Sequence, residues 1–114
     1  MKVIKKALID ILVINEEITI KNNEQFRIIM GKFLNESESN LILDLSHVSY
    51  LNSSGLGVIA DAAMKARKNG KELVIAGITP PIDEIFEIVK FNTFMELFPS
   101  LDLAENYFEQ KKVH

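Results

Sequence analysis

The sequence predicts an α/β fold in which a β-sheet is layered with helices. Short hydrophobic runs alternate with longer segments whose apolar residues recur every three or four positions. This alternating order is typical of βαβ units, and strands joined by a crossover helix should be parallel. The 114 residues, 47% of them hydrophobic, are enough to bury one core, so we expect a single domain over residues 1–114.

The first part of the chain predicts two strands and a helix. The aliphatic runs at residues 3–6 and 8–14 are typical of strands, and we expect them to pair with each other. Asn22 or Asn23 then caps a helix that ends near Asn35 and leads into an exit loop at residues 36–40. Its apolar positions fall at helical spacing and are Phe26, Ile29, Met30, Phe33 and Leu34.

Two buried strands and a helix follow in the middle of the chain. Residues 41–45 are almost continuously aliphatic, as expected of a strand that helices cover on both faces. Periodic apolar residues from Leu56 to Met64 predict a helix. Asn69 and Gly70 mark a turn into a second buried strand at residues 72–76.

The last part of the chain predicts two helices with an edge strand between them. Residues 79–81 open a helix, because proline is tolerated in the first turn. Residues 97–99 predict a short edge strand, since Pro99 removes a donor from the ladder. A final helix begins at Ser100 or Asp102 and reaches about Gln110. In the helix that opens at residues 79–81, the residues that we expect to face the sheet are Ile82, Ile85, Phe86 and Val89.

Polar and small residues gather at the start of the central helix. Asn52, Ser53 and Ser54 are candidate caps, and simple capping without further function is one interpretation. A helix N-terminus also favours an anion, including a phosphate carried by a serine. Gly55 and Gly57 require a reason, since a glycine in a helix interior costs roughly 0.5–1 kcal/mol relative to alanine. Either the helix packs closely on its strand or another molecule approaches its backbone, and the sequence leaves both open.

The stretch from the central strand to its helix resembles a known family. An acidic strand end, a short loop and a Ser-Ser-Gly-Leu-Gly run are similar to the anti-sigma factor antagonists, whose STAS domain is shared with sulfate transporters. The resemblance implies a small mixed β-sheet of about four to five strands, with about four helices layered mainly on one side. It continues through residues 68–75, and its core residues are Asp44, Leu45, Val48, Leu51, Ser53, Ser54, Gly55, Leu56, Gly57 and Val58.

The same resemblance implies a function and a partner. It identifies Ser53 as the phospho-acceptor, with Ser54 as the second choice. The partner would be an anti-sigma factor with serine kinase activity, and a phosphatase would reverse the modification. Sequestering that partner frees a sigma factor, so that transcription is regulated without direct contact to DNA. The expected partner-binding residues are Thr19, Asn52, Ser53, Ser54, Gly55, Leu56 and Gly57.

Two departures from the family pattern keep other hypotheses open. Asn52 stands where the family usually has aspartate, so a capping side chain is kept and a charge is lost. Residues 16–19 stand where members tend to carry Gly-Glu-Leu-Asp. A second hypothesis is therefore a constitutive STAS accessory or scaffold subunit of a transporter or a stress-signalling assembly, in which Ser53 and Ser54 are only caps. A third is a sensor that binds a small anionic ligand at the helix N-terminus.

Composition argues against several other functions. The net charge is −3, and its 13 basic and 16 acidic residues are spread along the chain, which does not indicate a nucleic-acid surface. With no cysteine, and with His47 and His114 far apart, we expect no metal site and no cofactor. Asp44, His47 and Ser53 lack a nucleophile elbow, so we do not expect an enzyme. No apolar run reaches the roughly 18 residues of a membrane span, and we expect a cytoplasmic protein of undetermined oligomeric state.

Overall fold

Four strands form one mixed sheet in the computed structural model, which describes residues 1–38 and 40–111. Their order across the sheet follows the chain: β1 (Lys2–Lys5), β2 (Asp10–Val13), β3 (Asn40–Asp44) and β4 (Glu72–Ala76). β1 is antiparallel to β2, whereas β2, β3 and β4 are parallel to one another. The α/β fold with a small mixed sheet is therefore confirmed, and the two N-terminal strands pair as expected.

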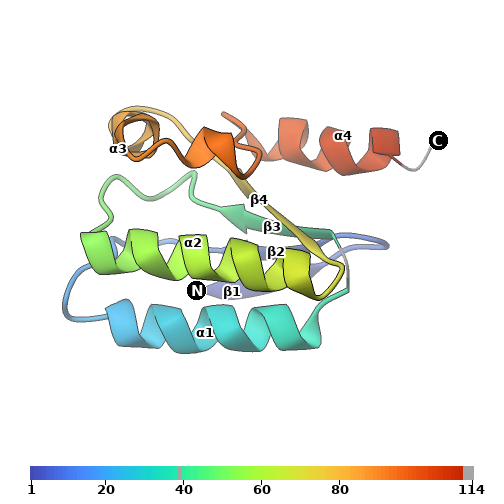
Figure 1. The fold of residues 1–114 in the computed structure, drawn as a ribbon, viewed down its shortest axis with the longest axis horizontal. Coiled ribbons are helices and arrows are strands. Elements are labelled where there is room, and N and C mark those ends of the chain that lie inside the picture. Colours follow the sequence, from blue (N-terminus) through green and yellow to red (C-terminus); the bar gives the residue numbers. More distant parts are fainter. Residues whose placement is uncertain (39, 112–114) are drawn as a thin grey trace.

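Two crossover helices lie side by side on one face of the sheet (Figure 1). α1 (Asn23–Glu36) connects β2 to β3, and α2 (Ser53–Lys68) connects β3 to β4. Right-handed crossovers in the same direction place both helices on the same side and point them the same way. The larger apolar core fills the space beneath them, and it includes Phe26, Met30, Phe33 and Leu34 of α1 and Ile59, Ala62, Ala63 and Ala66 of α2.

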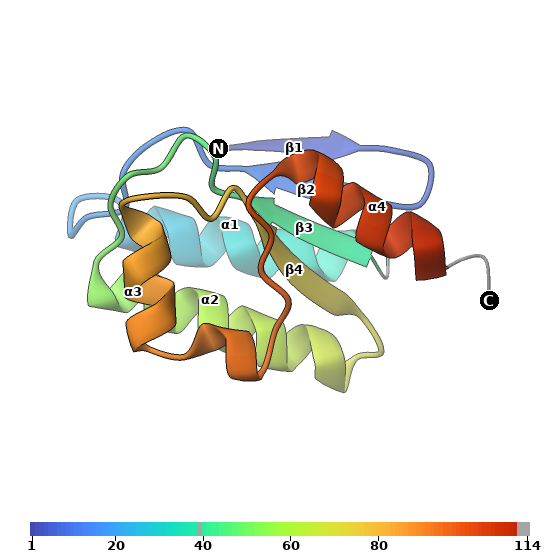
Figure 2. The same cartoon turned by 90° about the horizontal axis from the view of Figure 1, so that it is seen from above.

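The opposite face is covered by the C-terminal helix (Figure 2). α4 (Leu101–Lys111) begins after Ser100, whose hydroxyl oxygen accepts the Leu103 N–H at 3.3 Å. Ala104 and Phe108 pack there on Ile42 and Val74 in a second, smaller core. Because α3 (Ile82–Ile88) also contributes to the larger core, three of the four helices pack on the same cluster, as the family resemblance implies.

Two elements end at other residues than the sequence predicts. The second strand is shorter than residues 8–14, because residues 6–9 make the tight connection from β1, with the Lys6 N–H donating to the Ile9 carbonyl at 2.9 Å. Val89 does not face the sheet and is 43% exposed, since α3 ends at Ile88 and Lys90 takes a left-handed conformation with φ 58° that turns the chain away.

Residues 97–99 do not form a strand, and this prediction is wrong. Leu97 makes one isolated parallel bridge to Ile75 at the outer edge of β4. The Ile75 N–H donates to the Glu96 carbonyl at 3.1 Å, and the Phe98 N–H donates back to the Ile75 carbonyl at 2.8 Å. Pro99, which has no N–H, follows at once, so the pairing cannot extend. A single turn of 3₁₀ helix, η1 (Phe91–Thr93), precedes this segment.

Candidate functional site

The loop from β3 to α2 is fixed at both of its ends. Asp44, the last residue of β3, is buried, and its Oδ1 atom accepts hydrogen bonds from the backbone N–H of Ser46 at 3.0 Å and from the Ser46 hydroxyl. Val48 and Leu51 are buried in the larger core and anchor the middle and the end of the loop. The start of α2 is therefore held in one place by the strand before it and the core beneath it.

A second loop, between β2 and α1, lies against the end of this one. Ile18 bridges to Leu51: the Ile18 N–H donates to the Tyr50 carbonyl at 3.1 Å, and the Asn52 N–H donates to the Ile18 carbonyl at 3.0 Å. The carboxylate of Glu17 accepts two further hydrogen bonds, from the backbone and the hydroxyl of Ser49. Residues 16–19, which depart from the family pattern, thus lie beside the predicted phospho-acceptor loop, and Thr19 directly follows Ile18, whose carbonyl accepts the Asn52 N–H.

Asn52 is the N-cap of α2. Its Oδ1 atom accepts the Gly55 N–H at 2.8 Å, and its carbonyl accepts the Leu56 N–H as the first bond of the helix. Ser53 and Ser54 are the first two helical residues, and both are exposed. Backbone N–H groups at these positions have no carbonyl to bind within the helix, and the dipole is positive here. The site can accept an anion without breaking a bond of the fold.

The two glycines of this region have different surroundings. A Cβ atom built on Gly55 would lie 2.9 Å from Cγ2 of Ile18 and 3.2 Å from Oδ1 of Asn52. Gly55 is therefore explained by close packing of the helix. A Cβ atom built on Gly57 meets nothing within 4 Å, so that position is open to another molecule. Close packing thus explains Gly55, whereas approach of another molecule stays a prediction for Gly57.

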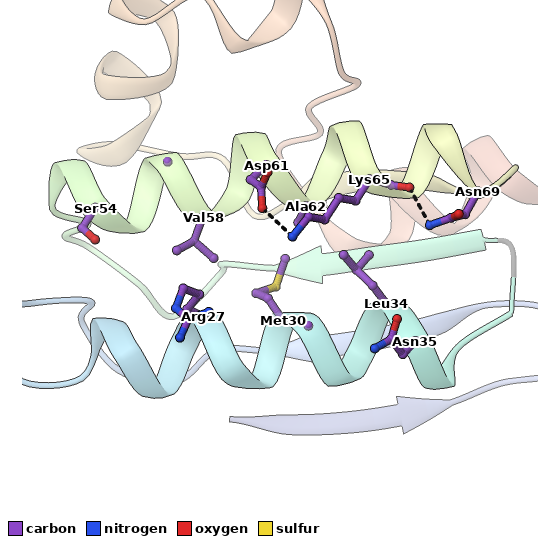
Figure 3. Close-up of a pocket in the computed structure, with 12 residues that line it drawn as sticks. Arg27, Met30, Leu34, Asn35, Ser54, Val58, Asp61, Ala62, Lys65 and Asn69 are labelled. Atoms are coloured by element: carbon purple, nitrogen blue, oxygen red, sulfur yellow. Dashed lines mark hydrogen bonds and ion pairs between the residues drawn. The ribbon is translucent and has the colours of Figure 1, made fainter.

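Sequence reasoning missed a groove that runs between α1 and α2 (Figure 3). It has a volume of about 530 Å³ and begins at Ser54 and Gly57. The sequence signals that could have pointed to it are two helical glycines with open surroundings, Gly57 and Gly31. Its lining residues are Arg27, Met30, Gly31, Leu34, Asn35, Ser54, Gly57, Val58, Asp61, Ala62, Lys65 and Asn69.

Two exposed apolar side chains beside the α2 N-terminus were also missed. Ile20 follows Thr19 and is 85% exposed, and Tyr50 is 49% exposed on the β3–α2 loop. The Ile18–Leu51 bridge joins their two loops, with Ile20 two residues after Ile18 and Tyr50 directly before Leu51. Neither stood out in sequence, because an isolated isoleucine or tyrosine is ordinary in any chain.

Three further features that the sequence analysis considered can be compared with the described ranges. Within the described ranges the Oδ1 atom of Asp44 accepts from Ser46, and no hydrogen bond joins Asp44 to His47 or His47 to Ser53. Residues 1–38 and 40–111 contain no group of three or more side chains suited to hold a metal ion. In the same residues no helix has the length and apolar character needed to cross a membrane.

The family model of the STAS domain matches residues 1–104. This chain belongs to the STAS domain family. Among its STAS relatives, BtrV of Bordetella bronchiseptica, a candidate anti-sigma factor antagonist by name, is 32% identical over 84 residues, which are 74% of this chain and 70% of that one. The anti-sigma-B factor antagonist of Listeria monocytogenes is 37% identical over 57 residues, half of each chain.

Solved structures of STAS proteins share this fold. An anti-sigma factor antagonist from Mycobacterium paratuberculosis superposes with a TM-score of 0.86 at 22% identity, covering 93% of this chain and 90% of that one. The phosphorylated form of the Bacillus cell-fate determinant SpoIIAA gives 0.70 at 13% identity, covering 94% and 97%. A sulfate transporter family protein from Wolinella succinogenes gives 0.79 at 15% identity, covering 94% and 89%. At these identities the likeness establishes the fold alone.

Proposed function

We propose that this chain is an anti-sigma factor antagonist that acts as one STAS domain in the cytoplasm. Its unphosphorylated form binds an anti-sigma factor with serine kinase activity, and the bound partner releases its sigma factor. Phosphorylation of Ser53 abolishes the contact, and a phosphatase restores it. The observation that carries this proposal is the exposure of Ser53 as the first residue of α2, directly after the Asn52 cap.

The contact surface surrounds the phospho-acceptor. It comprises the loop residues Thr19 and Asn52 and the first turn of α2 from Ser53 to Gly57. Ile20 and Tyr50 add the apolar area that gives an interface most of its binding energy. Both lie on loops that hydrogen bonds already hold, so little conformational entropy is lost when a partner covers them.

Electrostatics explains how a phosphate would act as a switch. It adds a charge of about −1.5 to −2 and three acceptor oxygens, so a surface fitted to a neutral hydroxyl suffers repulsion and desolvation. The domain itself is little affected, because the N–H groups at the start of α2 accommodate the anion. Affinity therefore changes while the fold stays the same.

The relatives support this reading. Proteins named as anti-sigma factor antagonists match both the sequence and the fold of this chain, and a protein of the same fold is known in a phosphorylated form. Ser54 is the next residue of the helix and is also exposed, so it is the second candidate acceptor.

The test combines phosphorylation with binding. The purified chain is incubated with ATP and a purified anti-sigma factor kinase from the organism that carries it, and mass spectrometry locates the phosphate. We expect the phosphate on Ser53, and we expect Ser53→Ala to remove it while the matched control Ser54→Ala keeps it. Titration calorimetry with the same kinase should show tight binding of the unmodified chain and at least a tenfold loss for Ser53→Glu. Equal affinities for wild type and Ser53→Glu would refute the switch.

A constitutive accessory or scaffold subunit is the second candidate function, and the fold shared with a sulfate transporter family protein favours it. In that case Ser53 and Ser54 serve only to begin the helix. The same experiment separates the two, because an accessory subunit would neither be phosphorylated by the kinase nor bind it.

A further inference from the structure

We infer that the free edge of β1 (Lys2–Lys5) binds an extended segment of a partner protein, in which two apolar residues lie between two acidic ones. This edge is a different surface from the proposed switch, and the inference does not depend on that proposal. β1 is the outermost strand on its side of the sheet (Figure 2). Its only pairing among the described residues is the antiparallel one with β2.

The chain covers the other edge of its sheet and leaves this one free. At β4 the Ile75 N–H donates to the Glu96 carbonyl at 3.1 Å, and the Ile75 carbonyl accepts the Phe98 N–H at 2.8 Å. Within residues 1–38 and 40–111 no segment makes such bonds to the outer side of β1. Unpaired N–H and C=O groups along a sheet edge are a template for an added strand.

The register identifies the backbone groups that are free. The Lys6 N–H donates to the Ile9 carbonyl at 2.9 Å, and the pairs of β1 and β2 continue the register of these two residues. Bonded and non-bonded pairs alternate along an antiparallel ladder. The even-numbered residues of β1 therefore bond to β2, whereas the N–H and C=O groups of Val3 and Lys5 point outward. Two donors and two acceptors are available to one extended segment.

A hollow of about 290 Å³ borders the edge and specifies an apolar residue of the occupant. Val3 lies opposite Leu12 of the larger core, so it is on the face of the sheet that α1 covers. Val3 is 45% exposed, and with the half-buried Ile29 of α1 it lines the hollow. A side chain of an added strand opposite Val3 would cover this apolar area, which is now in contact with water.

Lysines on both faces of the edge specify acidic residues on the occupant. Lys2 is exposed on the strand itself, and Lys32 is exposed on α1, where it lines the hollow. In the described part of the chain neither takes part in an ion pair. Lys5 lies 3.9 Å from Asp10, its neighbour on β2, so one acid already faces this strand from the inner side. Acids opposite Lys2 and Lys5 on the outer side would make favourable cross-strand pairs.

The same lysines argue against a second copy of the chain as the occupant. Antiparallel pairing of two β1 strands about Ile4 brings Lys2 of each copy opposite Lys6 of the other, and pairing about Lys5 brings the two Lys5 residues together. Like charges opposite each other destabilise a pair of strands. Pairing about Val3 leaves the lysines opposite apolar residues. In none of these pairings does a lysine face an acid, which is what a partner with the inferred sequence supplies.

NMR titration of the ¹⁵N-labelled chain with two synthetic hexapeptides tests the inference. The acidic probe is Thr-Glu-Val-Ile-Glu-Thr with blocked ends, and in its control both glutamates are replaced by lysine. In the free chain the Val3 and Lys5 amides should exchange with solvent faster than the Ile4 amide. The acidic peptide should slow exchange of the Val3 and Lys5 amides at least fivefold, and the basic peptide should bind at least tenfold more weakly.

A pair of variants tests the backbone contact. Val3→Pro removes an outward N–H, and proline is tolerated on an edge strand where that N–H faces solvent, so the fold should be kept. Val3→Ile is the matched control, since it keeps the N–H and the branched apolar side chain. We expect Val3→Pro to weaken binding of the acidic peptide tenfold or more and Val3→Ile to change it by less than twofold. Thermal unfolding verifies that both variants are folded.

Several results would overturn the inference. They are equal exchange of the Val3 and Ile4 amides in the free chain, no binding of the acidic peptide, equal binding of the basic one, and unchanged binding by a folded Val3→Pro protein. Exchange and peptide binding are measured on wild type, so they decide the matter even if Val3→Pro does not fold. Dimers of the free chain in sedimentation, lost with Val3→Pro, would assign the edge to a second copy. None of these measurements involves Ser53 or a kinase, so the proposed function stands or falls separately.

Discussion

Gly55 and Gly57, two residues apart in one helix, are expected to respond to alanine with opposite signs. At Gly55 the new methyl group would lie 2.9 Å from Cγ2 of Ile18, where ordinary contacts are 3.4–4 Å. Ile18 cannot recede, because its side chain is fully buried and hydrogen bonds to Tyr50 and Asn52 fix its backbone. The methyl group would also press on Oδ1 of Asn52 and weaken the N-cap bond to Gly55.

The magnitudes follow from these contacts. Overpacking costs about 1–3 kcal/mol, and loss of the cap costs up to about 1 kcal/mol. Helix propensity returns about 1 kcal/mol. Gly55→Ala should therefore lower the free energy of unfolding by about 1.5 kcal/mol, at the centre of a range of about 0–3 kcal/mol in which overpacking is the largest effect. Gly57→Ala, with open space around the new atom, should raise it by about 0.5–1 kcal/mol.

Urea unfolding followed by circular dichroism measures both values. With a slope of about 1–2 kcal/mol per M, the two midpoints should differ by about 1–2 M, one on each side of wild type. A stabilised Gly55→Ala protein would show that α2 does not pack on Ile18 as described. A destabilised Gly57→Ala protein would show that the space beside Gly57 is filled in solution, and the reasoning that links it to a partner would fail.

Two further predictions concern the rest of the domain. Gly77 has φ +80°, and a Cβ atom there would lie 2.3 Å from the backbone nitrogen of Ser46. Gly77→Ala should therefore lower the free energy of unfolding, measured by urea unfolding, by about 3 kcal/mol or more. A loss below about 1 kcal/mol would contradict this contact. Burial, and then the hydrogen bond to Glu72, raise the pKa of Tyr107 above its ordinary 10.0. A group whose pKa is raised on folding contributes stability below its unfolded pKa, so stability should fall as the pH rises above about 10, and Tyr107→Phe should flatten this decline; an unchanged decline would refute the assignment.

Local patterns were sufficient for most of the fold. The helical spacing of Phe26, Met30 and Phe33 predicted α1, and the asparagines predicted its start to within one residue, although the Asn22 side chain makes no cap hydrogen bond. The aliphatic runs predicted β3 and β4 to within one residue. In these elements the intrinsic propensity, the spacing of the apolar residues and the turn residues all favour the same secondary structure, and the tertiary contacts are consistent with it.

Features that depend on distant contacts could not be predicted. The spacing placed Val89 on the sheet side of a helix, but the left-handed turn at Lys90 ends that helix first. Gly55 and Gly57 are two glycines of the same helix. Their surroundings differ because Ile18, from another loop, packs against Gly55 and nothing packs against Gly57. The groove exists because two crossover helices lie side by side, which is a property of the sheet order and of no local pattern.

The substitution Asn52→Asp tests the structural role of this side chain separately from the effect of a charge at its position. Its side chain accepts the Gly55 N–H at 2.8 Å, and an aspartate can make the same bond. Asn52→Asp should therefore keep the cap and raise the free energy of unfolding by about 0.3–1 kcal/mol through the helix dipole, measured by urea unfolding. A phosphate on Ser53 would then face an adjacent negative charge, so the kinase should phosphorylate the variant more slowly if charge at this position governs the reaction. Destabilisation by Asn52→Asp would contradict the cap geometry, and an unchanged phosphorylation rate would show that the kinase reads the shape of this side chain and ignores its charge.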